Sequence, residues 1–466
     1  MKKQAFNPFL PGWEYIPDGE PHVFGDRLYL FGSHDRFDGD DYCQNDYVCW
    51  SAPVDDLSDW KYHGQIYDIT ADPLNTDGKY CGYAPDVCCG KDGRYYLYYA
   101  LNNHLAMSGA VSDCPSGPYD FLGHMKTVDG RIYGTKTGDA YCFDPGVIVN
   151  DDGRIHLYMG FSPTDDMAEL TEYLKRWRTE GCHHIELCDD MVTMKTEPLL
   201  IAPGKNISKG TSFYNHAFFE APSIRKYFGK YYLIYSSEHF QELCYAVGDL
   251  PEGPFEYKGR LVSNGDIGID GRLEPINHTG NNHGSLVCIA DKFYIFYHRH
   301  TNNTPYSRQA CAEEIEFSEG IFLQAEITSC GLNKGPLKAE GEYRAAIACN
   351  ISADMNNPPY ITQTGADREE NDSQYIKNMT DGAFVGFKYF DISFDKKVSV
   401  KVRSDNFGIF EISQKLNGSP VTTVNIQPCD DISEFISEGS LEEGTGALYF
   451  TYKGRGICDF HSFKFV

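Results

Sequence analysis

One phrase recurs five times along the first two-thirds of the chain: a short apolar run, a turn rich in Gly or Asp, and a second run rich in apolar and tyrosine residues. The copies are EPHVFGDRLYLFGS (20–33), APDVCCGKDGRYYLYYA (84–100), DPGVIVNDDGRIHLYMG (144–160), APSIRKYFGKYYLIYSS (221–237) and GSLVCIADKFYIFYHRH (284–300). Each copy predicts a β-hairpin. Aligned on Leu30, Leu97, Leu157, Leu233 and Ile295, the copies lie 60 to 76 residues apart, which leaves room for four strands. Repeated four-stranded units that close in a ring form a β-propeller, so five hairpins predict five blades.

The phrase stops near residue 330, where GLNKGPLKAEGEY (331–343) is typical of a linker. The segments beyond it, such as KKVSVKVRS and GALYFTYKG, alternate in a way that favours a β-sandwich. We therefore expect an all-β chain with a propeller at 1–328 and a sandwich at 329–466. The longest interval between hairpins contains TDDMAELTEYLKRWRTEG (164–181), whose apolar spacing predicts a helical insertion on one propeller face.

Charge and hydropathy exclude several classes of partner. The 466 residues carry a formal net charge of −26, and no Lys/Arg-rich run offsets it, which argues against nucleic acid and anionic membranes. The sequence contains no run of 18 apolar residues, so it predicts no membrane-spanning helix. The start, MKKQAFNPFLPG, lacks the apolar stretch of a signal peptide, so we expect a cytoplasmic chain, or a secreted one if a leader was trimmed. The aromatic content of 14% suits a neutral ligand such as a sugar.

Carboxylates recur where the inner strands of the predicted blades begin. The first repeat has Asp18 or Glu20 there, the third Asp144 and the fourth Glu220. Inner strands line the central channel, so these side chains should converge at one end of it. An acid and a base on opposite sides of a channel are what inverting hydrolysis of a glycosidic bond requires. A third carboxylate would hold the pKa of the acid up by repulsion. A lone Asp before Pro or Gly can simply cap a turn, but recurrence at equivalent positions favours catalysis.

Three segments resemble the catalytic segments of glycoside hydrolase family 43: PDGEPHVFGDRLYLFGSHD, FDPGVIVNDDGRIHLYMG and FFEAPSIRKYFGKYYLIYSS. Members of this family are five-bladed propellers that act mostly on arabinose- and xylose-containing plant polysaccharides. The resemblance covers residues 5 to about 325. It implies that Asp18 is the general base, that Asp144 modulates the pKa of the acid and orients it, and that Glu220 is the general acid.

Two further segments extend the resemblance. YSRQACAEEI resembles the segment that carries an arginine beside the base, which implies Arg308. GNNHGS resembles the segment whose histidine helps to hold an axial cation through water, which implies His283, although a lone buried histidine is usually a core residue. The family usually has Asp-Pro at the base, whereas this chain has Asp18-Gly19-Glu20-Pro21. Counting back from RLYLF favours Asp18 and leaves Glu20 as the alternative.

Further residues are candidates for binding the sugar. Tyr83, in GYAPD, stands where relatives often carry Trp and could stack on a sugar ring or simply pack an inner strand. Phe219 precedes the presumed acid and is assigned to the same site. Asp86, together with His34 and Asp35 of the SHD motif, could donate or accept hydrogen bonds to sugar hydroxyls.

The C-terminal segment is similar to a family 6 carbohydrate-binding module, from KAEGEY through IKNMTDGAFVGFKYFDI to ICDFHSFKFV. Glu340 and Asp459 match positions of that module's structural calcium site, whereas Lys338 stands where a ligand carboxylate is common. The alternative is that this domain is a structural cap on the propeller.

We therefore expect an inverting, exo-acting α-L-arabinofuranosidase or β-xylosidase that acts on oligosaccharides or polysaccharides from plants. The chemistry needs no cofactor, and a structural Ca²⁺ is an open addition. Three alternatives remain: an endo-arabinanase or xylanase, another furanosidase such as a galactofuranosidase, and a sugar-binding propeller without catalysis. A propeller that only binds sugar does not need an acid and a base on opposite sides of a channel, which argues against this alternative.

Overall fold

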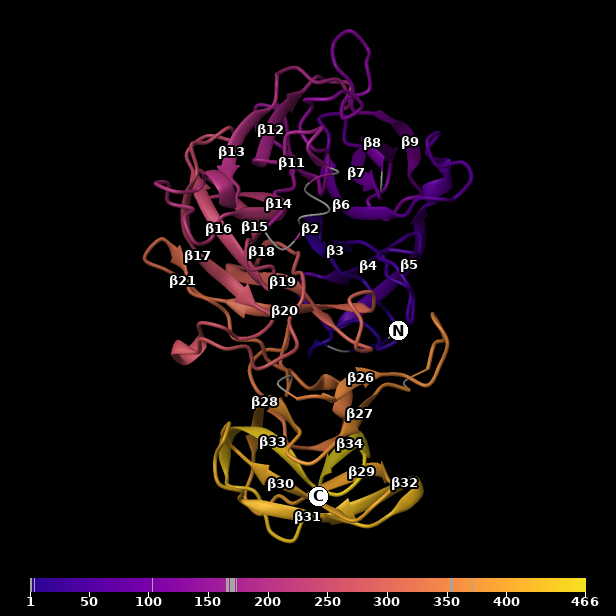
Figure 1. The fold of residues 1–466 in the computed structure, drawn as a ribbon, viewed down its shortest axis with the longest axis vertical. Coiled ribbons are helices and arrows are strands. Elements are labelled where there is room, and N and C mark those ends of the chain that lie inside the picture. Colours follow the sequence, from indigo (N-terminus) through magenta and orange to yellow (C-terminus); the bar gives the residue numbers. More distant parts are fainter. Residues whose placement is uncertain are drawn as a thin grey trace.

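The computed structural model describes residues 2–3, 5–102, 104–164, 167, 172, 174–352, 355–371 and 373–466. The chain forms a β-propeller and a β-sandwich that stack along the long axis of the molecule (Figure 1). The described residues include no helix that is long and apolar enough to cross a membrane.

Five antiparallel sheets form the propeller, and in each the strands follow chain order from the inner to the outer edge. Blade I has β2 (Glu20–Phe24), β3 (Arg27–Phe31), β4 (Tyr47–Pro53) and β5 (Asp59–Tyr67), with β1 (Lys2–Lys3) on its outer edge. Blade II has β6 (Gly82–Cys89), β7 (Tyr95–Leu101), β8 (His104–Ser112) and β9 (Asp120–His124). Blade III has β10 (Gly146–Val149), β11 (Ile155–Gly160), β12 (Gly181–Leu187) and β13 (Leu199–Pro203).

The last two blades complete the ring. Blade IV has β14 (Phe218–Tyr227), β15 (Lys230–Ser237), β16 (Glu242–Gly248) and β17 (Glu256–Ser263). Blade V has β18 (Leu286–Ile289), β19 (Lys292–His300) and β20 (Arg308–Ile315), followed by the small hairpin of β21 (Phe317–Ser318) and β22 (Ile321–Phe322). Short 3-10 turns lie between strands: η1 (Ile69–Ala71), η3 (Lys205–Ile207) and η4 (Ile269–Gly271).

The five predicted hairpins are the first two strands of the five blades, so the propeller is confirmed. The residues on which the repeats align are all fully buried: Leu30, Leu97, Leu157, Leu233 and Ile295. A bridge between Gly19 and Gly284 joins blade V to blade I and closes the ring. Inner strands β2, β6, β14 and β18 surround its centre in Figure 1, so residues at their starts meet at one end of the channel.

The C-terminal domain is a sandwich of two six-stranded sheets. One sheet contains β23 (Leu337–Lys338), β25 (Asn350–Ile351), β28 (Phe384–Ile392), β30 (Gly408–Ser413), β31 (Thr422–Ile426) and β33 (Gly444–Gly454). The other contains β24 (Gly341–Arg344), β26 (Tyr360–Thr362), β27 (Tyr375–Met379), β29 (Val398–Ser404), β32 (Cys429–Ile436) and β34 (Cys458–Phe465). The turn η5 (Ala345–Ile347) packs beneath β34. Alternating apolar residues from both sheets fill the core.

The predicted domain boundary and the predicted helical insertion stay predictions. The propeller core includes Ile327 and the sandwich core includes Leu337, and the predicted boundary at 328/329 falls between them. The helix predicted at 164–181 falls partly outside the described residues, because 165–166, 168–171 and 173 are not among them. Of its described part, Leu174 is buried against Phe161 and Phe219.

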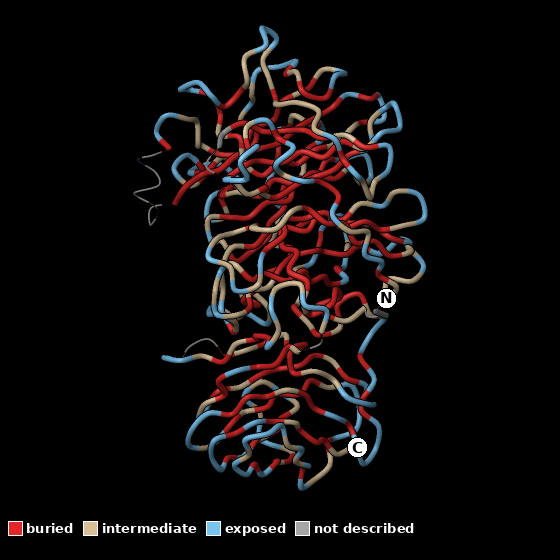
Figure 2. The backbone as a smooth tube through the Cα atoms, turned by 90° about the vertical axis from the view of Figure 1, so that its right-hand side faces the viewer, coloured by how far each residue is buried: buried red, intermediate tan, exposed pale blue. Residues whose placement is uncertain are grey.

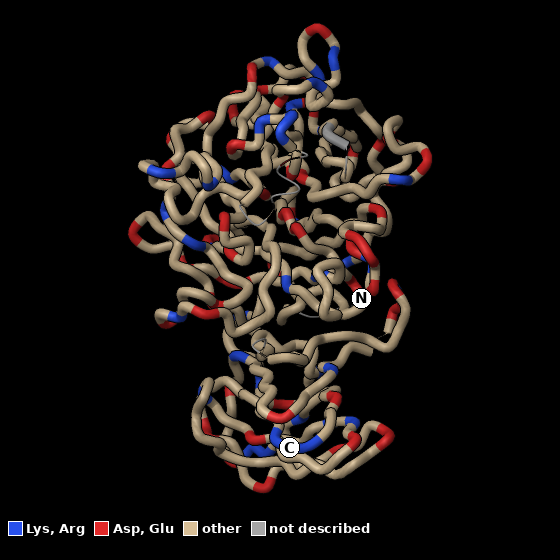
Figure 3. The backbone as a smooth tube through the Cα atoms, viewed as in Figure 1, with Lys and Arg blue, Asp and Glu red and all other residues tan. Residues whose placement is uncertain are grey.

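The two domains share buried contacts, and Figure 2 shows that each domain has buried residues in its interior. Lys388 of the sandwich is 3% exposed, and its Nζ lies 2.9 Å from Asp266 Oδ2 and 2.8 Å from Glu326 Oε1, both in the propeller part of the chain. Breaking a buried ion pair leaves an uncompensated charge and typically costs about 3–5 kcal/mol. Acidic residues are otherwise spread over the loops of both domains (Figure 3).

Candidate active site

A pocket of about 480 Å³ opens at one end of the propeller channel. Seven residues predicted from the sequence line it: Asp18, Tyr83, Asp144, Phe219, Glu220, His283 and Arg308. They come from all five blades. The ring geometry therefore brings together side chains that are up to 290 residues apart in the chain.

In four blades a residue close to the start of the inner strand lies in the left-handed region of backbone space. These residues are Asp18 (φ 56°), Ala84 (φ 37°), Asp144 (φ 48°) and Ala221 (φ 63°). The last three each precede a proline, and Asp18 precedes Gly19. Residues other than Gly pay on the order of 1–2 kcal/mol for this conformation, and such strain collects at functional sites. Asp18 therefore occupies the same structural position as Asp144, and Glu220 lies one residue before that position in blade IV.

Glu20, the alternative to Asp18, lies below the pocket and does not line it. Its Oε2 accepts hydrogen bonds from Arg225 Nη2 at 2.5 Å and from Ser223 Oγ at 3.0 Å. Burial and the charge of Asp86 raise the pKa of Glu20 to about 8, against the opposing effect of Arg225. The register deduced from RLYLF thus agrees with the geometry, because Asp18 is the carboxylate that reaches the pocket.

Asp18 is held ionised by the groups around it. Arg308 Nη1 donates to Asp18 Oδ1 at 3.0 Å, and the Asp18 backbone N–H donates to His298 Nδ1 at 3.3 Å. Burial on its own raises the pKa of Asp18, but the charge of Arg308 and the nearby rings of His283 and His298 outweigh it, so the pKa lies below the ordinary value. A carboxylate that stays charged can serve as a general base.

Glu220 has the opposite electrostatic character. It is half-buried in the pocket wall, and burial together with the charge of Asp18 raises its pKa to about 8. Burial and repulsion from Glu220 and Asp18 also raise the pKa of Asp144 well above its ordinary value. Asp144 Oδ2 accepts from the backbone N–H of Ala221, the residue after Glu220, at 3.2 Å. This pair of carboxyl groups therefore retains a proton near neutral pH.

Asp35 acts on Arg308 and is not a sugar contact. It is fully buried, and its Oδ2 accepts from the Arg308 backbone N–H at 3.0 Å and from Nε at 2.9 Å, while Oδ1 accepts from Nη2 at 2.9 Å. These bonds leave Arg308 Nη1 directed at Asp18. The guanidinium carbon of Arg308 also lies 4.8 Å from the ring centre of Tyr42.

His34 and Asp86 are likewise outside the pocket lining. His34 is 3% exposed; its Nδ1 lies 2.7 Å from the Asp46 carbonyl and its Nε2 lies 3.0 Å from Glu14 Oε1. Asp86 pairs with His22 Nε2 at 2.7 Å and accepts from the Val147 N–H at 2.7 Å. The expectation of direct sugar contacts is therefore corrected for Asp35, His34 and Asp86, because protein groups already occupy their hydrogen-bonding atoms.

His283 lies between the pocket and the deeper Glu20. Its Nδ1 is 3.9 Å from Asp18 Oδ1 and 3.8 Å from Asp144 Oδ2, and its Nε2 is 3.9 Å from Glu20 Oε1. Within the described part of the chain, neither His283 Nε2 nor Glu20 Oε1 has a hydrogen-bond partner, although both are buried. Buried polar atoms are normally satisfied, and a separation near 4 Å suits a bridging water. These two atoms therefore fit a water molecule at the channel axis, through which a neighbouring cation could be held.

The predicted calcium site of the sandwich is not formed. Asp459 Oδ2 accepts from Arg403 Nη2 at 2.6 Å and its Oδ1 from the Asn378 N–H at 3.2 Å. Glu340 is exposed and precedes β24, whose Gly341 pairs with Phe465 at the far end of β34. Six residues of strand separate Asp459 from that end, which is roughly 20 Å. Glu340 and Asp459 therefore cannot share one ion.

Several pocket residues carry no sequence signal of the kind used above. They are Tyr42, Cys43, Phe143, Phe161, His239, Phe240, Gln241 and Asn281. Phe143 adjoins Asp144 and could have been found by proximity. Tyr42 lies in the loop between β3 and β4, which has no periodic pattern.

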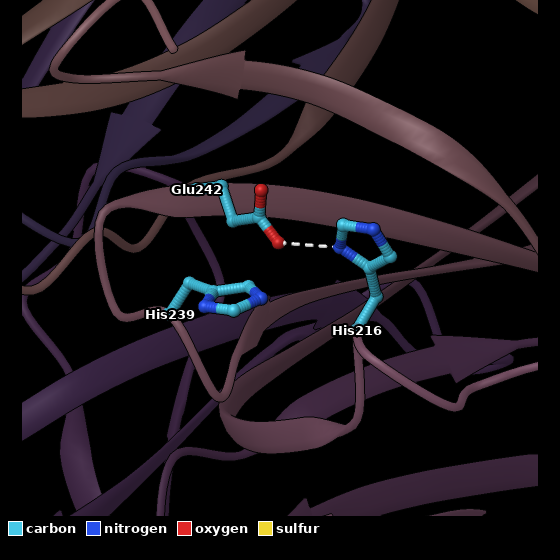
Figure 4. Close-up of side chains that lie close together, drawn as sticks. All are labelled: His216, His239 and Glu242. Carbon is cyan, nitrogen blue, oxygen red and sulfur yellow. Dashed lines mark hydrogen bonds and ion pairs between the residues drawn. The ribbon is translucent and has the colours of Figure 1, made fainter. Parts of the chain in front are cut away.

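His239 at the pocket rim belongs to a cluster with His216 and Glu242, whose ligand atoms lie close enough together to hold a metal (Figure 4). Protein groups already satisfy the Glu242 carboxylate of this cluster. Glu242 Oε1 accepts from His216 Nδ1 at 2.7 Å and from Ser237 Oγ at 2.6 Å, and Arg260 lies 3.5 Å from Oε2. An arginine beside the carboxylate already balances its charge, so we assign the cluster a structural role.

Comparisons with known proteins agree with this geometry. Residues 7–322 match the model of glycosyl hydrolases family 43. A curated relative from Thermoclostridium stercorarium, named xylosidase/arabinosidase, is 47% identical over 99% of both chains. An arabinoxylan arabinofuranohydrolase structure from Bacillus subtilis, solved with cellotetraose, has a TM-score of 0.53 at 19% identity and covers 100% of this chain and 98% of its own. A β-xylosidase/α-arabinofuranosidase structure from a compost metagenome, solved with xylotriose in a calcium-free form, has a TM-score of 0.53 at 25% identity and covers 69% of this chain and 98% of its own.

Proposed function

The chain belongs to glycosyl hydrolases family 43, and on this premise we propose that it is an exo-acting glycosidase that releases a terminal xylosyl or arabinofuranosyl unit with inversion. One observation carries the proposal. A single pocket holds Glu220, whose pKa is raised to about 8, and Asp18, whose pKa Arg308 and its neighbours hold down. Two carboxyl groups whose surroundings push their pKa values apart are the signature of an acid and a base.

The roles of the groups follow from these proton affinities. Asp18 accepts a proton from a water molecule as the water oxygen attacks the anomeric carbon. Glu220 donates its proton to the glycosidic oxygen as the bond to the anomeric carbon breaks. Asp144 fixes the backbone next to Glu220 and shares the retention of a proton with it. One water is consumed, and the enzyme recovers its proton balance when Asp18 returns a proton to solvent and Glu220 takes one up.

The shape of the pocket supports a small glycosyl unit. A volume of about 480 Å³ is of the size that holds one or two sugar rings. Tyr42, Tyr83, Phe143, Phe161 and Phe219 give it aromatic walls on which the apolar face of a sugar can stack. The T. stercorarium relative bears the name xylosidase/arabinosidase, and we extend these two activities to this chain.

No cofactor takes part in this chemistry. We propose that a hydrated cation, Ca²⁺ being the candidate, lies on the channel axis beside His283 and Glu20 and contacts them through its water molecules. Burial lowers the pKa of His283, which keeps its imidazole neutral and able to accept such a contact. The charge of the cation would add to that of Arg308 in favouring the ionised form of Asp18.

Nitrophenyl glycosides test the proposal directly. We expect nitrophenol release from the β-D-xyloside, the α-L-arabinofuranoside or both, and much less from the β-D-galactofuranoside. Reducing-end analysis of xylo- and arabino-oligosaccharides should show single sugars as the first products. Failure to cleave the xyloside and the arabinofuranoside, or internal cleavage of oligosaccharides, would overturn the proposed function.

A further inference from the structure

The loop between β3 and β4 forms one wall of the pocket. Its Tyr42 and Cys43 line the pocket, and Tyr42 packs over the guanidinium of Arg308. Asp35, in the same loop, binds Arg308 and also accepts a hydrogen bond from the Cys43 N–H at 3.0 Å. The shape of this loop therefore determines both the pocket wall and the position of the arginine beside Asp18.

Residues 32–46 of this loop have no regular secondary structure. Within the loop, the Asn45 N–H donates to the His34 carbonyl at 3.0 Å and the Gly39 N–H donates to the Arg36 carbonyl at 3.0 Å. A loop with few backbone hydrogen bonds of its own needs anchors from elsewhere to hold one shape.

Such an anchor comes from the sandwich domain. Asp367 lies in the turn between β26 and β27, and its Oδ1 accepts from the Phe37 N–H at 2.8 Å. Its Oδ2 accepts from Asn45 Nδ2 at 3.1 Å. Phe37 and Asn45 belong to the first and second halves of the loop, so one carboxylate ties these halves together.

The same contact continues to the catalytic pocket. Asn45 Nδ2 also donates to the Asp35 carbonyl at 3.0 Å, and the Asp35 carboxylate holds Arg308. Arg308 in turn donates to Asp18. A run of hydrogen bonds therefore leads from Asp367 in the sandwich, through Asn45 and Asp35, to the arginine at the base.

Arg368 fixes the turn that carries Asp367. Its Nη1 binds the buried Glu14 and lies 2.9 Å from His34 Nε2, and its Nη2 donates to Tyr62 Oη at 2.8 Å. The guanidinium carbon lies 5.2 Å from the ring centres of Trp13 and Tyr62. If the turn moved away, the charge of Glu14 would remain buried and lose its cation, which is strongly unfavourable.

We propose that Asp367 is a positioning residue of the glycosidase site, and that the sandwich domain serves as a scaffold for the pocket wall formed by residues 34–46. The proposal rests on the proposed function and adds to it a role for the C-terminal domain. Asp367 touches no substrate in this arrangement; it acts through Asn45 and the loop.

The test uses the full chain with Asp367→Ala, and Glu370→Ala as the control, since Glu370 is an exposed acid in the same turn. We expect kcat/KM on a nitrophenyl glycoside to fall about 10- to 100-fold in Asp367→Ala, the usual cost of a displaced site, and to stay at the wild-type value in Glu370→Ala. KM should rise several-fold, because the wall that touches the sugar moves. A variant that merely lost folded protein would lower the apparent kcat and keep its KM.

Two further measurements keep the result interpretable. Asp367→Asn keeps one acceptor oxygen but turns an NH2 donor toward the other donor, Phe37 N–H or Asn45 Nδ2, so it should recover only part of the loss. Hydrogen exchange of peptides covering residues 34–46 should be faster in Asp367→Ala than in Glu370→Ala, and this readout does not depend on activity. If Asp367→Ala fails to fold, Asn45→Ala breaks the link between Asp367 and Asp35 from the propeller side and should also raise KM and speed exchange at 34–46.

The outcomes separate the two proposals. A folded wild-type protein that cleaves neither glycoside contradicts the proposed function, while the exchange experiment still decides whether Asp367 holds the loop. Wild-type KM and wild-type exchange at 34–46 in Asp367→Ala would overturn the positioning role and leave the glycosidase assignment intact.

Discussion

Arg308 donates one guanidinium N–H to Asp18 at 3.0 Å, while Asp35 accepts two hydrogen bonds from the rest of the guanidinium and a third from the Arg308 backbone N–H. Arginine suits this position because its planar fork can satisfy two carboxylates at once and stays charged. The pair links the first blade to the fifth and sets the charge of the proposed base.

Replacement of Arg308 should change the pH dependence as well as the rate. The pKa of Asp18 is held below its ordinary value, with Arg308 as the main lowering influence. In Arg308→Met the pKa of Asp18 should rise, so the base is protonated at higher pH and the acidic limb of kcat/KM moves upward. We expect a loss on the order of 10²–10⁴-fold at neutral pH, as for a lost acid or base. An unmoved acidic limb in a folded variant would contradict the assignment of the base.

Removal of the acid should depend on the leaving group. Glu220→Ala should lose on the order of 10²–10⁴ in kcat on natural linkages, the usual value of proton transfer. It should lose much less on a dinitrophenyl glycoside, whose leaving group departs without a proton. Asp18→Asn should lose rate on both substrates alike. Equal losses of Glu220→Ala on the two substrates would show that Glu220 is not the acid.

Glu20→Gln is the matched test of register in blade I. Glu20 lies below the pocket and accepts from Arg225 and Ser223. Gln keeps one acceptor oxygen but disturbs this buried network, so we expect lower stability and a rate per folded molecule far closer to wild type than that of Asp18→Asn. Thermal melting and active-site-normalised kcat measure the two effects separately. A stable but inactive Glu20→Gln variant, together with an active Asp18→Asn variant, would show that Glu20 and not Asp18 is the base.

The basic limb of the activity profile should report Glu220. Its pKa of about 8 means that the acid is protonated below that pH and loses its proton as the pH rises through it. Activity on natural linkages should therefore decline above about pH 8. Asp144→Asn removes a neighbouring carboxylate that repels Glu220, so the limb should move to lower pH with a reduced kcat. A basic limb that stays in place in Asp144→Asn would argue against coupling of these two groups.

Hydrolysis should invert the anomeric carbon, since the proposed base activates water and does not attack the sugar itself. Proton NMR of the first-formed product, read before mutarotation, distinguishes the anomers. Early appearance of the retained anomer would mean that a carboxylate acts as a nucleophile.

Truncation near residue 330 should expose the dependence of the propeller on the sandwich. It removes Arg368 and Lys388, which are the cations of the buried Glu14 and Asp266. We expect the fragment to aggregate or to melt far below the full chain. A soluble, fully active fragment would instead identify the C-terminal domain as an independent module.

The sequence by itself predicted the five blades, because a hairpin depends on alternation and turn residues that are close together in the chain. Repeat position also predicted Asp18, Asp144, Glu220 and His283 as members of one site, because it determines where each inner strand begins. Arg308 was implied by the family resemblance. The family resemblance assigned their roles, which remain to be tested.

Tertiary structure decided the rest. His34, Asp35 and Asp86 carry polar atoms suited to sugars, yet their neighbours Glu14, Arg308 and His22 come from distant segments and already occupy those atoms. The strand register of the sandwich separates Glu340 from Asp459. Asp367 reaches the loop of Tyr42 across 330 residues of chain. Loops have no period that a sequence can display, and their contacts depend on how whole domains pack, so these relationships follow from the fold and not from any local pattern.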